Sequence, residues 1–288
     1  MSTAAAAAIR VVWRGEGEYP FWLGRIHDPP GALWVRGRLR PEEGSRSVAI
    51  VGARAATPLG QSFARVLAAD LASAGLTIVS GLARGIDTAA HLGALEAGGR
   101  TVAVLGSGID RPYPRQNAAL ADAIARTGAL VSEFPPGTDA WKSNFPRRNR
   151  TIAGWSRAVV VVEAGERSGA LITARVALDE GREVMAVPGH PSSPGAAGTN
   201  ALLRDGAAVV RDARDVLVEL GLDPPAAPAP LAVPADPLLA ALPRGVPATL
   251  EEIAARVPRP VPELLARLSE LELSGAVRRV SGALFVRS

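Results

Sequence analysis

Residues 47–75 read SVAIVGARAATPLGQSFARVLAADLASAG. The segment begins with an apolar run, continues through a glycine turn and ends in a long stretch with apolar side chains at helical spacing. An apolar run without alternating polar positions is typical of a parallel strand that is buried on both faces. This segment therefore predicts one strand, turn and helix unit.

The same unit recurs along the chain up to residue 222. Later apolar runs are LTIVSG, RTVAVLGS, ALVSEF, AVVVVEA, EVMAVPG and AAVVRD, and helical stretches such as GIDTAAHLGALEAGG and SGALITARVALDEG lie between them. Strands that alternate with crossover helices form a mainly parallel, doubly wound sheet. We therefore predict an α/β fold with a Rossmann-like sheet.

Changes in composition divide the chain into domains. We expect a flexible tail over residues 1–17 and an extended Rossmann-like domain over residues 18–222, in which 18–46 are a lead-in segment and 47–222 the βα repeats. Residues 223–237 include DPPAAPAPLAVPADP, and proline at this density predicts an extended linker. Residues 238–288 predict a small winged helix-turn-helix domain.

The winged-helix prediction depends on helix signals in the last 50 or so residues. Thr249 and Glu252 have the spacing of a capping box. We expect a common core of Ile253, Leu264, Leu265, Leu268 and Leu271.

The expected recognition helix of this domain is acidic. It spans about residues 263–274 and has Glu263, Glu270 and Glu272 against the single Arg267. Acidic side chains oppose binding to duplex phosphates. We therefore expect a module that contacts protein, although Arg278 and Arg279 in the wing remain available to DNA.

Composition excludes several classes of protein. The 288 residues contain no cysteine, which excludes disulfides, thiolate metal sites and cysteine nucleophiles. The formal charge is only +4, so the position of the charges matters more than their sum. No uninterrupted apolar run is long enough to cross a bilayer, and we expect a cytoplasmic protein.

Residues 141–156, WKSNFPRRNRTIAGWS, combine basic and aromatic side chains without an acidic residue. Cations that meet phosphates and rings that meet unstacked bases are typical of binding sites for single-stranded nucleic acid. Lys142 is the only lysine in a chain that otherwise uses arginine, which suggests a chemical demand at this position. A solvated, arginine-rich loop is the alternative interpretation, and Trp155 is expected to be buried.

The turns after the strands indicate where an anion would bind. In an open parallel sheet, ligands lie beyond the carboxyl ends of the strands. Neither GxGxxG nor GxxxxGK[ST] occurs, which removes the dinucleotide and P-loop fingerprints. Arg54 follows the first turn, and Ser168 and Gly169 begin a helix directly after a strand, so each place suits a phosphate.

The histidines and the acidic residues near the strand ends do not favour a catalytic site or a metal site. The three histidines are scattered at positions 27, 91 and 190, which does not indicate a metal site. Asp87 and His91 are spaced as a pair on a helix surface. We expect Glu133 and Glu163 to accept hydrogen bonds from turn amides, and we expect no catalytic residue, metal or cofactor.

Several long motifs in a fixed order resemble the DNA-processing protein A family (DprA, also called Smf). They are AIVGARAATPLG, SGLARGID, LGSGIDRPYP, SEFPPG, FPRRNRTIAGWS, VVEAGERSGALITA and AVPGH. The lead-in segment and the C-terminal LEEIAARV and LSELELSGAV also resemble this family, so the similarity covers nearly the whole chain.

The resemblance implies a single-stranded DNA-binding recombination mediator without enzymatic activity. Such proteins protect incoming DNA in natural transformation and load a RecA-type recombinase, as homodimers through the Rossmann-like domain, and a single-strand-binding protein is a further expected partner. The family's DNA pocket carries over to Arg54, Lys142 and Phe145. The expected site also includes Gly52, Arg148, Asn149, Arg150, Ser168, Gly169 and Thr173.

Some positions depart from the family pattern, and two other functions remain open. Ala53 stands where the family has serine in its GSR turn, and Thr151 and Trp155 stand at sites that are often aliphatic. One alternative is a nucleotide-processing enzyme similar to phosphoribohydrolases, although a PGGxGT loop is absent. The other is a duplex-binding regulator that acts through its winged helix.

Overall fold

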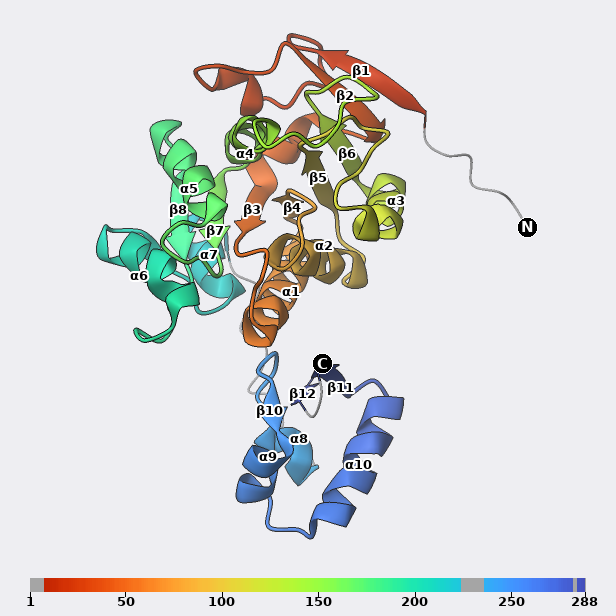
Figure 1. Cartoon of the computed structure of the whole chain (residues 1–288), viewed down its shortest axis with the longest axis vertical. Helices are drawn as coiled ribbons and strands as arrows, with labels where there is room; N and C mark the ends of the chain where they lie inside the picture. The colour runs from red at the N-terminus through yellow and green to blue at the C-terminus, as the bar shows by residue number, and fades with distance from the viewer. Residues whose placement is uncertain (1–7, 224–235, 282–283, 288) are drawn as a thin grey trace, which may run out of the picture. The chain divides into compact units, whose positions relative to one another are not determined.

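The computed structural model describes residues 8–223, 236–281 and 284–287. The chain divides into two compact units (Figure 1). The first comprises the described residues of Met1–Ala56 and Ala64–Asp223, and the second those of Thr57–Phe63 and Pro224–Ser288. Most of the expected linker over residues 223–237 lies outside the described residues.

Within the described residues, one large sheet has the strand order β1-β2-β6-β5-β4-β3-β7-β8-β9, and Figure 1 labels its strands from β1 to β8. The strands are β1 (Ile9–Trp13), β2 (Ala32–Gly37), β3 (Ser47–Val51), β4 (Thr77–Ser80), β5 (Thr101–Leu105), β6 (Ala129–Ser132), β7 (Ala158–Val161), β8 (Glu183–Ala186) and β9 (Ala208–Val209). All neighbouring pairs from β6 to β9 are parallel, whereas β1 and β2 extend the sheet in antiparallel pairing. The mainly parallel sheet that the sequence predicts is confirmed.

Helices lie between the strands of the large sheet along the chain, with a few short 3-10 turns. The helices are α1 (Pro58–Ser73), α2 (Ile86–Glu96), α3 (Ala118–Thr127), α4 (Asn144–Trp155), α5 (Gly169–Asp179), α6 (Ala197–Arg204) and α7 (Ala213–Glu219). The 3-10 turns are Leu23–Arg25, Pro41–Arg46, Arg115–Asn117 and Pro194–Ala196.

The core shows why the sheet is covered on both faces. In β5, Val102 and Val104 belong to one cluster with residues of α4 and α5, whereas Ala103 and Leu105 belong to another with residues of α3. Successive side chains of a strand point to opposite faces of the sheet. An apolar strand without alternation therefore serves two cores, which is the doubly wound arrangement.

The strand order reverses beside β3. From β3 the chain adds β4, β5 and β6 on one side, and then returns to add β7, β8 and β9 on the other. Helix α4 makes this return and contacts β5, β4 and β3 on its way to β7. Ligands of open α/β sheets bind outside the strand ends at such a reversal.

One boundary differs from the expected flexible tail over residues 1–17. Residues 9–13 form β1, which pairs with β2 along its whole length. Val12 is buried, while Ile9 and Trp13 on the other side of the strand are exposed. This β-branched segment with one buried side chain and a full set of ladder partners therefore forms part of the sheet.

The second unit has the elements of a winged helix. They are α8 (Pro237–Ala241), β10 (Ala248–Thr249), α9 (Leu250–Arg256), α10 (Val261–Leu273), β11 (Val277–Ser281) and β12 (Leu284–Arg287). The capping box between Thr249 and Glu252 is confirmed. Of the predicted core leucines, Leu265 is wrong, because it lies on the exposed side of α10.

Candidate functional site

A groove lies at the carboxyl ends of β3 and β7, where the strand order reverses. All predicted site residues except Arg150 line it. They are Gly52, Arg54, Lys142, Phe145, Arg148, Asn149, Ser168, Gly169 and Thr173. We call this the switch-point groove.

The first wall of this groove is the turn after β3. The amide of Ala53 donates to the carbonyl of Glu163 at 2.7 Å, which joins the turns after β3 and β7. A β-carbon at Gly52 would lie 2.9 Å from that same carbonyl, so only glycine allows the two turns to approach this closely. Arg54 then extends from the turn with an exposed side chain.

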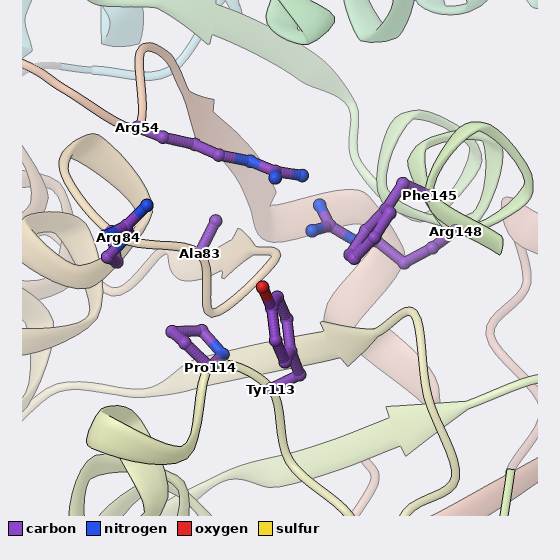
Figure 2. A pocket seen from close by; sticks show the side chains of 7 residues that line it. All are labelled: Arg54, Ala83, Arg84, Tyr113, Pro114, Phe145 and Arg148. Carbon is purple, nitrogen blue, oxygen red and sulfur yellow. The ribbon is translucent and has the colours of Figure 1, made fainter. Parts of the chain in front are cut away.

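Two arginines and a tyrosine lie close to the Phe145 ring in the groove. The guanidinium carbons of Arg54 and Arg148 lie 4.8 and 5.8 Å from the ring centroid. The Tyr113 ring lies 6.0 Å away and is tilted by 53°. Figure 2 shows these four side chains pointing into one opening, with Arg84 and Pro114 at its edge.

The first turn of helix α4 lies at this opening. Pro146 is its third residue, where the missing amide hydrogen has no helical partner to lose. Phe145, Arg148 and Asn149 are at helical spacing, so they share the face of α4 that lines the groove. The exposed Lys142 lies just before the helix.

Arg148 is a buried cation. Its side chain is 6% exposed and its Nη1 atom lies 3.9 Å from the carboxylate of Asp87, which is buried to the same degree. A β-carbon at Gly81 would overlap the guanidinium, so the arginine lies directly on the backbone of the β4 turn. The position of this charge therefore depends on a glycine.

Asp87 holds the turn and the arginine together. Its carboxylate accepts hydrogen bonds from the amides of Gly81 and Ala83 at 3.1 and 3.3 Å. Burial raises the pKa of Asp87, while the Arg148 charge and the two amides oppose that rise. Burial likewise lowers the pKa of Arg148, and Asp87 opposes that shift.

The start of α5 forms the opposite wall. Ser168 caps the helix by accepting from the amide of Ala170 at 3.3 Å. Asn149 donates to the carbonyl of Gly169 at 3.3 Å and so joins α4 to α5. Thr173 is buried one turn further along. This wall presents helix amides and small side chains, which suit an anion.

Arg150 is the one predicted site residue that the structure does not bring to the switch-point groove. It lies on another face of α4, 2.9 Å from the carboxylate of Glu133, and it also contacts Asp28. A helix turns about 100° per residue, so neighbouring arginines of the run point in different directions. Arg150 connects α4 to β6 and the lead-in segment.

Sequence reasoning missed several groove residues. Arg84 and Tyr113 line the opening around Phe145, and Asp87, Arg167 and Ile172 line the rest of the groove. Arg84 and Tyr113 lie in the turns SGLARGID and GSGIDRPYP. Their position after β4 and β5 was the signal that could have identified them.

The acidic residues and His91 differ from their expected roles. Asp87 and His91 are not a surface pair, because both are buried, and His91 Nδ1 lies 2.7 Å from Thr101 Oγ1. Glu133 pairs with Arg147 and Arg150 rather than with a turn amide. Within residues 8–223, 236–281 and 284–287, no group of three His, Asp or Glu side chains has the geometry of a metal site.

The fold and the groove define a class of protein, namely a Rossmann-like protein with a cationic and aromatic groove at its switch point. A family profile described as DNA recombination-mediator protein A matches residues 10–221. A second profile, described as the DprA winged helix domain, matches residues 222–283. The chain belongs to the DNA processing protein A (DprA) family, which confirms the resemblance of its motifs.

Individual relatives agree with this assignment. The chain is similar to Protein Smf of Escherichia coli, with 43% identity over 277 residues that cover 92% of this chain and 74% of that protein. The X-ray structure of DprA from Streptococcus pneumoniae has a TM-score of 0.69 and 40% identity, and the match covers 73% of this chain and 74% of that one.

A structure of DNA processing protein A from Helicobacter pylori also matches. It has a TM-score of 0.66 and 28% identity over 74% of this chain and 95% of that one, and it concerns the single-stranded DNA binding mode of that protein. In the part of this chain that the structure describes, no helix is long and apolar enough to span a membrane.

Proposed function

We propose that this chain binds single-stranded DNA in the switch-point groove. The observation that carries the proposal is the Phe145 ring, whose centroid lies 4.8 and 5.8 Å from the guanidinium carbons of Arg54 and Arg148. A ring offers a face to any unstacked base, and the cations beside it neutralise phosphates. Lys142 and the amides at the start of α5 supply further phosphate contacts.

The recessed position of the ring favours single strands over duplex. Phe145 is only partly exposed and its neighbours Arg54, Arg148 and Tyr113 surround it. A base inside a duplex is stacked on both faces, so it must leave the stack before it can reach such a ring. An unpaired base reaches the ring without that cost.

We infer a mediator role for the bound strand. The chain would protect DNA that enters during natural transformation and load a RecA-type recombinase onto it. Membership of the family and the single-stranded DNA binding of the H. pylori relative support this proposal. It requires binding and release rather than catalysis, so we propose no enzymatic step.

The same proposal includes a location and partners. We place the protein in the cytoplasm, as a homodimer through its Rossmann-like domain, with a single-strand-binding protein as a further partner. The exposed acidic residues Glu263, Glu270 and Glu272 of α10 favour protein contact over duplex contact for the winged helix.

A salt titration with single-stranded and duplex DNA of equal length tests the proposal. Each phosphate that a protein cation neutralises contributes about 0.7 to the slope of log K against log salt for single strands. We expect a clear preference for the single strand and a slope that corresponds to several contacts. Equal affinity for both forms, or a slope near zero, would contradict the proposal.

A further inference from the structure

A second groove lies on the other side of α4 from the switch-point groove. It is formed by β1, β2, the loop before β2, the end of β6 and α4, and it is lined by Trp13, Trp34, Pro30, Glu133, Arg147 and Arg150 among others. We call it the tryptophan groove. None of the predicted site residues except Arg150 lines it.

Two indole rings lie on one face of the β1–β2 ribbon. Trp34 pairs with Val11, and Trp13 pairs with Ala32, so the two tryptophans are diagonal neighbours on the same face. Diagonal side chains across an antiparallel pair lie roughly 7–8 Å apart at the backbone and remain within reach of each other. Trp13 is 60% exposed, which leaves a ring face open on the sheet.

An arginine lines the same groove as these rings. Arg147 is largely exposed, at 59% of its side chain; its Nη2 atom lies 3.4 Å from Glu133 and its Cζ atom lies 5.1 Å from the centroid of the Phe134 ring. The Glu133 side chain is only 4% exposed, so the cation rather than the carboxylate is accessible. The groove therefore offers a cation and aromatic faces, which are contacts that an unpaired nucleotide uses.

Helix α4 contributes residues to both grooves. Phe145 and Arg148 line the switch-point groove, whereas Arg147 and Arg150 line the tryptophan groove. These residues alternate around the first turns of a single helix, so a strand that leaves Phe145 meets Arg147 only two residues further along. The step from one groove to the other is short compared with an oligonucleotide.

We propose that a single strand anchored at Phe145 continues across α4 into the tryptophan groove, where an unpaired base stacks on Trp13 and Arg147 contacts a phosphate. This inference rests on the proposed function, because it extends the same DNA site. An exposed tryptophan also suits a protein partner. The Arg147 guanidinium, which lines the same groove as the rings, and the short separation of Phe145 and Arg147 on α4 favour DNA.

Oligonucleotide length separates the two grooves in an experiment. A strand of about six nucleotides fills the switch-point groove alone, whereas one of about 20 reaches both. We expect Trp13→Ala to weaken binding of the long strand about five- to tenfold, because a base loses its stacking surface. The short strand should bind within about twofold of wild type.

Two further variants complete the design. Arg147→Gln should lower the salt slope for the long strand by about 0.7 and leave the slope for the short strand unchanged. Phe21→Ala is the matched control, because Phe21 is an exposed aromatic residue beside a cation, Arg25, and lines neither groove. Melting temperatures of all variants check that the fold is intact.

Each outcome decides the proposal. Wild-type affinity of Trp13→Ala for the long strand, or an equal loss at both lengths, overturns it. Normal DNA binding combined with a loss of recombinase loading would also overturn it and would assign the groove to a protein. If Phe145→Ala binds both strands like wild type, the switch-point site itself fails, and that result is distinguishable from the others.

Discussion

The guanidinium of Arg54 lies over the ring of Phe145, with 4.8 Å between its Cζ atom and the ring centroid. The two residues are more than 90 positions apart in the chain, and they meet because the turn after β3 and the start of α4 both lie at the switch point. A cation over one part of a ring leaves another part open for a base. This pair therefore combines a phosphate contact and a base contact in one place.

Removing the ring should weaken binding strongly. Phe145→Ala should reduce affinity for single-stranded DNA about tenfold or more, since stacking contributes roughly 1–3 kcal/mol per base. Fluorescence anisotropy at fixed salt measures the effect, and Phe21→Ala serves as the aromatic control. A variant that binds like wild type would remove Phe145 from the site.

The exposed cations should be visible in the salt dependence. Lys142→Ala and Arg54→Ala should each lower the slope of log K against log salt by about 0.7, because each loses a phosphate contact. Arg204→Ala is the control, since Arg204 is exposed on α6 and its ion pair is with the adjacent Asp205. Unchanged slopes for both groove variants would contradict the phosphate assignment.

The close contact of Arg148 with the β4 turn predicts a large effect from one methyl group. Gly81→Ala should displace the guanidinium, because the new β-carbon would overlap it. We expect a lower melting temperature and weaker DNA binding together. Gly17→Ala should change neither, since no atom lies within 4 Å of the β-carbon there. A fully stable Gly81→Ala variant with normal affinity would show that this position of the Arg148 guanidinium is not required.

Burial of His91 predicts a loss of stability in acid. Burial lowers the pKa of His91 from 6.5 to about 3, so the folded chain keeps it neutral while the unfolded chain takes up a proton. The stabilisation is therefore fully present above pH 6.5 and is lost as the pH falls toward 3.

Urea unfolding of His91→Gln tests this contribution. Between pH 7 and pH 5 the wild type should lose about 2 kcal/mol more of its free energy of unfolding than the variant. His190→Gln is the control, because His190 is exposed. Parallel losses in wild type and His91→Gln would show that His91 titrates normally.

The acidic surface of α10 predicts that the winged helix contributes little to DNA affinity. A chain without residues 238–288 should retain most of its affinity for single strands, because the exposed glutamates oppose phosphates. Gel shifts with single-stranded and duplex DNA measure this, and circular dichroism checks the fold. Loss of most DNA binding would instead favour a duplex-binding regulator.

Much of the site could be predicted because strand-end turns of a parallel sheet meet at one edge. Arg54, Lys142 and Phe145 were identified from glycine turns, from basic and aromatic residues and from the family resemblance, and the structure brings all three to one groove. The contribution of β5 to two cores likewise follows from its unbroken apolar run.

Other parts required the direction of each side chain. Arg148 and Arg150 are two positions apart, yet one is buried against Asp87 and the other pairs with Glu133. The sequence run PRRNR does not reveal where its helix starts, and a shift of one residue rotates every side chain by about 100°. Asp87 and His91 were expected at the surface for the same reason.

The sequence by itself determined the fold class, the family and the presence of a cationic, aromatic strand-end segment, because these depend on local patterns of burial and on ordered motifs. Only the tertiary structure decided that Arg54, Arg148 and Tyr113 lie next to the Phe145 ring. It also decided that Arg150 lines the tryptophan groove. Those relationships depend on the return of α4 across the sheet and on its rotation about its own axis, which are set by packing of the whole core.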